Sequence, residues 1–536
     1  MGVPSDVRRW LGLIAIALGV AIVVVDTTIV NVIVPSIIGD LGVDSAQAQW
    51  IQESYAIIFA ALLLVVGRAS DILGARRVFV TGVVVFGLSS LLAGVAADGT
   101  YLILARFIQG AGAALILPTS LALLNASFTG KARGQAFAVW GSTIGAAAAL
   151  GPLLGGWLSE HVSWRWAFGV NIPLTLVILV GSFLFLDRSA PRGGKVDIIG
   201  AVLSVTGLGL LAFGLIEGRN YGWVTTSSPA RIFGYSWSSR ISPVLIAFVL
   251  AAALLMAFTL RQRALTRGAR PDSALMDVRL FSIGSFRSGN IATLIIGVGE
   301  FGIVAVLPLW LQFTLNYSAV TAGLALVPIA LGSFVASGAS FGAAEKVSPL
   351  SLVRIGLALE AIGLAGLALL AATDNRFWHI GLVLFVYGVG VGFATAQVTN
   401  VVLVDIPELS SGQASGIQST FRQLGSALGI AVLTTTFFSA LSSTLNGRLL
   451  AAGTPPERAG DLSRAVTASA GAAIKGLARD PHTASAASAA RDAMTHSLTI
   501  CGVIATAFLL VGLVSTALIP TGPRDRDVEG ATAQTQ

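Results

Sequence analysis

The stretch WLGLIAIALGVAIVVVDTTIVNVIVPS, residues 10–36, is apolar along nearly its whole length, and Asp26 is its only charged residue. Because an α-helix rises about 1.5 Å per residue, this stretch is long enough to cross the ~30 Å hydrocarbon core of a bilayer. A charged side chain at the centre of a bilayer costs about 2.5–3.5 kcal/mol, and such residues generally mark a functional pathway. The sequence therefore predicts a membrane-spanning helix that carries a functional carboxylate.

The rest of the chain has the same apolar character. Of its 536 residues, 55% are hydrophobic and 11% are charged, whereas about a quarter of the residues in a soluble domain are charged. Apolar stretches of about 20 residues recur along the chain, which is typical of an all-α polytopic membrane protein. We predict fourteen spans, near residues 10–36, 48–66, 78–97, 101–123, 135–158, 166–186, 197–217, 241–261, 288–311, 319–342, 350–372, 377–404, 414–440 and 497–519.

Basic residues set the predicted orientation. Arginine and lysine gather in every second short connection, starting after the second span, so the positive-inside rule places both termini in the cytoplasm. The first span continues past Asp26 without a small-residue cleavage site, so we expect it to be retained rather than removed as a signal peptide. The arginine- and alanine-rich composition is that of a GC-rich bacterium, which indicates the bacterial inner membrane.

Residues 441–496 form a long connection between the last two predicted spans, and this topology places them outside. They carry six basic residues, but long loops cross a membrane largely regardless of charge. We expect this loop either to form small helices over the outer face or to be a solvated hairpin.

The composition excludes several classes of function. Cys501 is the single cysteine, so the chain has neither an internal disulfide nor a cysteine-based metal site, and its four histidines are scattered. Gly130-Lys131 and Gly194-Lys195 lack the Ser/Thr and the spacing of a phosphate-binding loop. We therefore expect no ATP and no other cofactor. We also predict that the protein is not an enzyme, because no cluster of His, Asp or Ser appears at a membrane face.

The basic balance of the chain, with a pI near 10, fits anchoring beside anionic lipids. The chain contains no basic domain that could bind nucleic acid, so membrane lipids are the expected partners of this charge.

Two segments combine glycine with charge or proline. The loop after the second span reads GRASDILGARR, in which glycines permit tight turns, the aspartate can cap a helix end, and two arginines lie at headgroup level. The fifth span ends on GPLLGG, where proline removes one helical hydrogen bond and glycines permit close contact between helices. The loop charges also fit the positive-inside rule alone. We single out one set of residues as an inner gate: Gly67, Asp71, Gly74, Arg76 and Arg77. We single out a second set as the packing motif: Gly151, Pro152, Gly155 and Gly156.

Together with DTTIVNVIVP (26–35), SWRWAFGVNIP (163–173) and LPLWLQFTLNYSAVTAG (307–323), these segments resemble the signature motifs of the major facilitator superfamily, specifically its fourteen-helix drug:proton antiporter branch. The resemblance covers about residues 10–440 and the last span. Three positions depart from the family pattern, since the loop has Ile72 and Ala75 in place of basic residues, and Ala147 replaces a glycine.

The resemblance implies two six-helix bundles, residues 1–186 and 288–519, with a substrate cavity between them and alternating access by rocking. Residues 187–287 would add two helices between the bundles and an inner linker, and residues 520–536 a cytoplasmic tail. The implied function is export of small amphipathic or cationic compounds by a monomer, driven by protons. The same fold leaves open a lipid, a glycolipid or a self-made natural product as the cargo.

The candidate site residues are charges inside predicted spans. Asp26, Glu53 and Arg106 all fall roughly 7–8 Å below the outer surface, judged from the helix rise. Arg106 can pair with one carboxylate and leave the other to carry a proton, although a fixed structural ion pair with Asp26 is also open. Glu300 lies near mid-membrane in span nine, which corresponds to span one in the second bundle. We expect these four residues at the cavity.

Four further polar residues lie inside the spans. Asn31 is about 140° around the helix from Asp26, so it is expected to bond to a neighbouring helix. Gln312 and Arg422 are taken as supporting polar residues of the cavity, and Arg422 has no evident partner. Glu360 lies in a span that forms outer scaffold in this family, so packing or snorkelling is expected for it.

Overall fold

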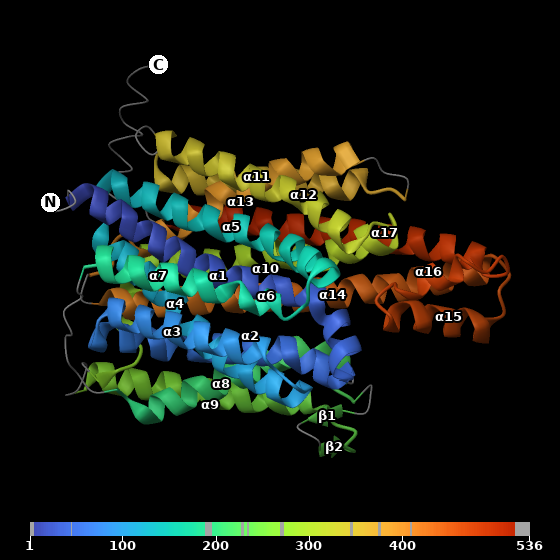
Figure 1. Cartoon of the computed structure of the whole chain (residues 1–536), viewed down its shortest axis with the longest axis horizontal. Coiled ribbons are helices and arrows are strands. Elements are labelled where there is room, and N and C mark those ends of the chain that lie inside the picture. The colour runs from blue at the N-terminus through green and yellow to red at the C-terminus, as the bar shows by residue number, and fades with distance from the viewer. Residues whose placement is uncertain are drawn as a thin grey trace.

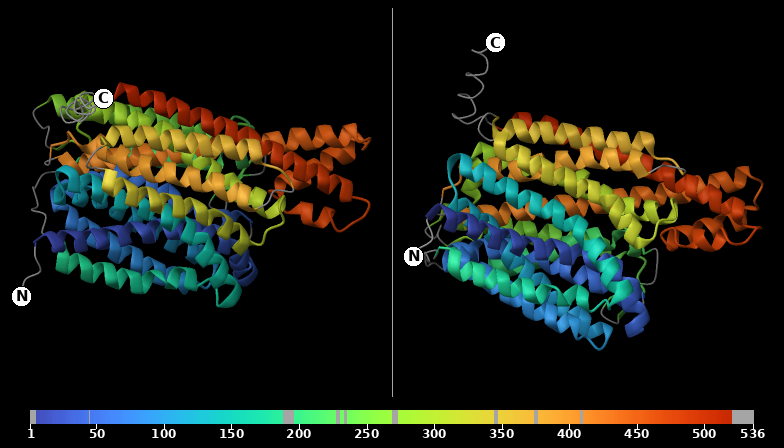
Figure 2. Two further views of the ribbon diagram at one scale, coloured as in Figure 1. Left: turned by 90° about the horizontal axis from the view of Figure 1, so that it is seen from above. Right: turned by 45° about the horizontal axis from the view of Figure 1, so that its top comes forward.

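The computed structural model describes residues 5–43, 45–187, 196–226, 230–232, 235–268, 273–343, 347–373, 377–407 and 410–519. Long helices run side by side with roughly parallel axes (Figures 1 and 2). In the described part, thirteen helices are long and apolar enough to cross a membrane. The remaining predicted span, 319–342, lies on helix α11 (Ala319–Ala343), whose described apolar stretch is shorter. Each of the fourteen predicted spans thus falls on a helix.

The first bundle contains six predicted spans, the last of which is interrupted. Pro173 has no N–H to donate to the carbonyl of Gly169, and its ring crowds that carbonyl, so the helix breaks there. The elements are α1 (Ser5–Leu41), α2 (Ser45–Leu73), α3 (Ala75–Gly94), α4 (Gly99–Ser127), α5 (Gly130–His161), α6 (Trp166–Gly169) and α7 (Asn171–Phe185).

The second bundle contains α11 and also has six predicted spans. Its other helices are α10 (Gly284–Phe313), α12 (Pro349–Leu370), α13 (Phe377–Leu403), α14 (Ser411–Ala451) and α17 (Ala484–Ser515), and the short 3₁₀ helices η2 (Val278–Ser282) and η4 (Thr516–Leu518) flank it. The two bundles meet along two seams, α5 with α11 and α2 with α14.

The two extra helices, α8 (Ile198–Tyr221) and α9 (Pro243–Arg267), pack on each other at one side of the molecule (Figure 1). A two-stranded antiparallel hairpin, β1 (Ala230–Ile232) and β2 (Tyr235–Trp237), connects them. The expected position between the bundles is wrong, because α2 and α14 contact each other directly and α8 packs on both from the side. Exposed apolar residues such as Val202 and Val249 suit this pair to face lipid.

Residues 441–496 are helical rather than an extended loop. Helix α14 continues to Ala451, α15 (Pro456–Ala468) and α16 (Ala473–Leu477) follow, and α17 begins at Ala484. These segments project beyond the rest of the bundle at the right of Figure 1. Val466, Ile474 and Met494 are buried in these segments and belong to the apolar core that continues into the bundles. The alanine-rich sequence favours helix, and this core holds the helices together.

Candidate functional site

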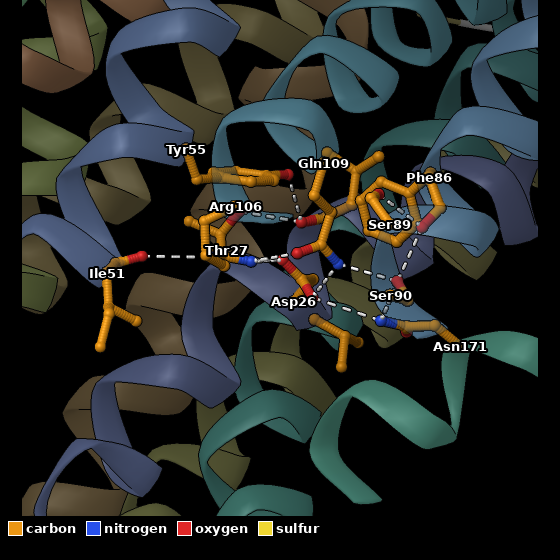
Figure 3. Close-up of polar contacts among 12 residues, drawn as sticks. Asp26, Thr27, Ile51, Tyr55, Phe86, Ser89, Ser90, Arg106, Gln109 and Asn171 are labelled. Atoms are coloured by element: carbon orange, nitrogen blue, oxygen red, sulfur yellow. Dashed lines mark hydrogen bonds and ion pairs between the residues drawn. The ribbon is translucent and has the colours of Figure 1, made fainter. Parts of the chain in front are cut away.

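A network of buried polar side chains surrounds Asp26 in the first bundle (Figure 3). Arg106 on α4 forms an ion pair with Asp26, and both residues are buried. The amide of Gln109 donates to the Asp26 carboxylate (2.7 Å) and to the Ser90 hydroxyl (2.8 Å). Asn171 donates to the same carboxylate (3.2 Å). Helices α1, α3, α4 and α7 thus supply one connected cluster.

The Arg106 guanidinium has further partners besides Asp26. It donates to the carbonyl of Ile51 (3.1 Å) and to the side chain of Gln109 (2.7 Å). The ring of Tyr55 lies 4.3 Å from the guanidinium carbon, a distance at which a cation and a ring attract each other. A buried ion pair is stable only when such extra bonds satisfy its remaining donors and acceptors.

The predicted pairing of Asp26 with Arg106 is confirmed. In this conformation, however, Asp26 is 0% exposed and lies inside the first bundle, not at a cavity surface. Sequence reasoning did not single out Gln109, Ser90 or Asn171. The available signal was that Gln109 stands one helical turn from Arg106 at nearly the same depth.

Glu53 lies apart from this network. Tyr55 faces Arg106, and since successive residues turn about 100° around a helix, Glu53 points to roughly the opposite side of α2. There Glu53 acts electrostatically on Tyr221 of α8, as does Glu217. Of the two candidate carboxylates, Arg106 thus pairs with Asp26, and the described contacts of Arg106 do not include Glu53.

A second charged cluster surrounds Glu300 in the second bundle. The Glu300 carboxylate accepts a hydrogen bond from Thr395 (3.1 Å), and Tyr387 donates to the Glu300 backbone carbonyl (2.9 Å). Arg422 of α14 attracts the carboxylate electrostatically. Arg422 thus has the partner that the sequence alone did not reveal.

Arg422 also reaches the first bundle. Its guanidinium carbon lies 5.7 Å from the ring of Trp140 on α5 and 5.7 Å from the ring of Phe301 on α10. The Trp140 indole donates to Ser120 (3.0 Å), which fixes the ring. A carboxylate, a cation and two aromatic rings therefore meet where the bundles face each other. Sequence reasoning named only Glu300 and Arg422.

Two of the supporting polar residues add little to this picture. Gln312 is half-buried, and the structure records no hydrogen bond of its side chain to the residues it describes. The side chain of Asn31 lies outside the described residues.

Asp71 joins the two bundles at the end of the molecule that carries the GRASDILGARR loop. Its carboxylate accepts from the backbone N–H groups of Gly412 (2.7 Å) and Gln413 (2.8 Å). These N–H groups belong to the first turn of α14, where helical donors are unsatisfied and the helix dipole is positive. A side chain at Gly67 would place its Cβ 2.6 Å from the Gly412 carbonyl, so glycine is required at this crossing.

The other loop residues have different surroundings. Gly74 adopts φ +90° at the start of α3, a conformation that favours glycine. Arg76 donates to the carbonyls of Ser182 (3.2 Å) and Phe183 (3.0 Å), which ties α3 to α7 within one bundle. Arg77 is exposed, and its side chain makes no hydrogen bond or ion pair with the described residues.

Further contacts close the same end. Asn125 of α4 donates to Ser411 of α14 (3.1 Å), and Gln397 of α13 donates to the Gly134 carbonyl of α5 (3.2 Å). Together with Asp71, these bonds hold the bundles together on the side of the GRASDILGARR loop.

We expect Asp71→Asn to loosen this closure. A hydrogen bond to a charged group contributes about 1.5–3 kcal/mol, so losing the charge shifts the open population about tenfold or more. The shift is measured as the rate at which an impermeant maleimide labels Ser411→Cys in a Cys501→Ser background. Arg77→Gln in the same background is the matched control and keeps the slow rate. Equal labelling of the two variants would contradict the assignment.

The GPLLGG segment packs α5 tightly against α1. A Cβ at Gly151 would collide with the Thr28 hydroxyl, and one at Gly155 would lie 2.8 Å from Ile29. A Cβ at Gly156 would meet Val320 of α11 at 3.2 Å, and Pro152 lies inside α5. Close packing is thus confirmed for these glycines. Because Thr28 follows Asp26 on α1, α5 connects the Asp26 cluster with the helix that carries Trp140.

Two helical bundles that meet along two seams, with charged residues buried in each, define a transporter of the alternating-access class. The sequence model described as Major Facilitator Superfamily matches residues 16–260 and 198–430. The chain belongs to the major facilitator superfamily.

Similar proteins agree with this membership. A puromycin resistance protein of Streptomyces alboniger is 34% identical, over 82% of this chain and 84% of its own length. The multidrug efflux pump LfrA of Mycolicibacterium smegmatis is 30% identical, over 88% of this chain and 90% of its own. The crystal structure of the human organic anion transporter MFSD10 has the same fold, with a TM-score of 0.59 at 14% identity, covering 95% of this chain and 99% of that one.

Proposed function

We propose that this protein exports amphipathic, often cationic, organic compounds across the cell membrane in exchange for protons. The observation that carries the proposal is the position of Arg422, which lies 5.7 Å from the rings of Trp140 and Phe301 where the bundles face each other and attracts the Glu300 carboxylate. Similarity to a puromycin resistance protein and to a multidrug efflux pump supports the same class of cargo.

The chemistry of this interface suits a cation. Aromatic rings and a carboxylate attract a cation within about 6 Å, and apolar rings accept ligands of varied shape. Arg422 already occupies such a position between Trp140 and Phe301. A bound drug cation would compete with Arg422 for Glu300.

Protons are the proposed source of energy, without ATP or another cofactor. One charge that crosses 100 mV supplies about 2.3 kcal/mol, and each pH unit adds about 1.4 kcal/mol. One proton is thus enough for a substrate gradient of about a hundredfold. Glu300 is the proposed exchange site at the interface. Asp26 would take part when movement of α1 and α5 opens the network that seals it here.

The proposal also covers the oligomeric state, the location and the conformational change of the protein. The protein would act as a monomer in a bacterial inner membrane, with both termini in the cytoplasm, and would transport its substrate without converting it. Rocking of the bundles would break the Asp71 contacts with α14 and open the seam to the cytoplasm.

Ethidium transport into inverted membrane vesicles tests this proposal. Vesicles that contain the protein should accumulate ethidium when a pH gradient is imposed, and an uncoupler should abolish the accumulation. Accumulation that persists with the uncoupler would overturn proton coupling. Vesicles that move no ethidium or other drug, from cells whose lipid profile changes on expression, would favour a lipid as cargo instead.

A further inference from the structure

Glu360 on α12 has a buried carboxyl group that bonds to none of the residues the structure describes. The residue is 0% exposed, and neither carboxylate oxygen has a partner among the described residues. Snorkelling, one of the two expectations from the sequence, is therefore wrong. An ionised carboxylate without a partner in an apolar interior is very costly, so this position accepts the protonated form far more readily.

Glycines make the room that Glu360 occupies. A Cβ at Gly390 of α13 would lie 2.6 Å from the Glu360 Cγ, and a Cβ at Gly363 would lie 2.7 Å from the backbone of Tyr387. Helices α12 and α13 are thus too close for the carboxyl group to reach lipid between them. The side chain is held inside the second bundle.

Few groups that titrate or carry charge face Glu360. Glu300 of α10 repels Glu360 electrostatically, and both carboxylates act on Tyr387 of α13 in the same way. Helix α17, which also packs on α12, has the buried thiol of Cys501, and this thiol donates to the Leu433 carbonyl (3.3 Å). The cation that offsets the charge of the two glutamates is Arg422, through Glu300.

The charge balance of this group is therefore incomplete. Arg422 supplies one positive charge that acts on Glu300, and two buried carboxylates that repel each other cannot both ionise readily without a second positive charge. That second charge is either a proton or a cationic substrate beside Glu300.

We propose that Glu300 and Glu360 share one exchangeable proton, held by Glu360 while the charge of Arg422 offsets that of Glu300, and displaced when a cationic substrate binds. Because the Glu360 oxygens bond to no described residue in this conformation, the transfer requires a movement that brings the two carboxyl groups into contact. The O–H bond of Glu360 then breaks, the proton passes to the Glu300 carboxylate, and Glu300 releases it to water at the interface. The substrate cation then replaces the proton as the second positive charge. This inference rests on the proposed function and assigns its proton to a particular residue.

Proton release on ethidium binding tests the assignment. Purified protein in a weakly buffered detergent solution is mixed with ethidium, and a pH indicator reports the protons released. Wild type should release about one proton per ethidium from this pair, and Glu360→Gln should lose that proton, because Arg422 already balances the remaining carboxylate. Glu360→Asp should keep the release, since it keeps the acid. The double variant Glu360→Gln plus Arg422→Gln should release a proton again, because Glu300 then has no counter-charge and holds the proton itself. Such a recovery would exclude simple structural damage by Glu360→Gln.

A transport measurement tests the same role of Glu360 independently. In proteoliposomes with no membrane potential and a pH difference of about one unit, loss of one coupled proton lowers the limiting ethidium ratio about tenfold. Wild-type release that Glu360→Gln leaves unchanged would overturn this inference and leave the proposed function standing. Absence of release and of coupling in wild type would overturn the proposed function itself.

Discussion

Glu300→Gln is expected to reduce uphill ethidium transport at least tenfold, to the level seen with an uncoupler. Glutamine has nearly the same volume and can still accept the hydrogen bond from Thr395, so the local packing is kept. It can neither bind and release a proton nor offer a negative charge to Arg422 or to a cationic substrate. The measurement is accumulation of ethidium in proteoliposomes under an imposed pH gradient.

Glu300→Asp is the control for this result, because it keeps the carboxyl group and should retain a measurable part of the uphill transport. Wild-type accumulation by Glu300→Gln would show that this carboxylate neither exchanges the proton nor recognises the cation.

Arg106→Ala should destabilise the protein more than any surface change. It leaves the Asp26 carboxylate buried with no counter-charge, and breaking a buried ion pair in this way costs about 3–5 kcal/mol. The expected result is a large loss of thermal stability in detergent, measured beside Arg77→Ala, whose side chain is exposed.

A combined Asp26→Asn and Arg106→Gln variant removes both charges and keeps amide hydrogen bonding. We expect it to recover most of the lost stability, because the cost in Arg106→Ala comes from an unpaired charge. If Arg106→Ala were as stable as Arg77→Ala, the ion pair between Asp26 and Arg106 would not contribute to the stability of the protein.

The sequence predicted the membrane architecture well, because the length and hydropathy of a span depend on local composition. The depth of a residue in the membrane could also be predicted, since the helix rise places Asp26 and Arg106 at one level. These two residues do form an ion pair. Depth does not give the direction around the helix axis. Glu53 was grouped with Asp26 and Arg106 on depth alone, and the structure turns it toward α8.

Contacts between the bundles were beyond sequence reasoning. Arg422 and Trp140 are far apart in the chain, and only the packing of α14 near α5 brings them together. Glu360 was misjudged for a similar reason, because nothing in its own helix indicates that Gly390 on another helix makes room for it. For residues 441–496 the sequence left small helices and a solvated hairpin both open, because low hydropathy gives no clear helix signal outside the membrane, and the structure shows helices.

The α5 helix gives a physical link between the two charged clusters. It contacts α1 beside Asp26 through Gly151, and it presents Trp140 to Arg422. Movement of α5 during rocking would therefore alter the surroundings of both Asp26 and Glu300, which is what exchange of protons against substrate requires.

The most direct test of the central claim follows ethidium and protons together in proteoliposomes that contain the wild-type protein. The account predicts that ethidium moving up its gradient is accompanied by protons moving the opposite way, and that both fluxes stop together with an uncoupler. Uphill ethidium movement with no opposing proton flux would contradict it.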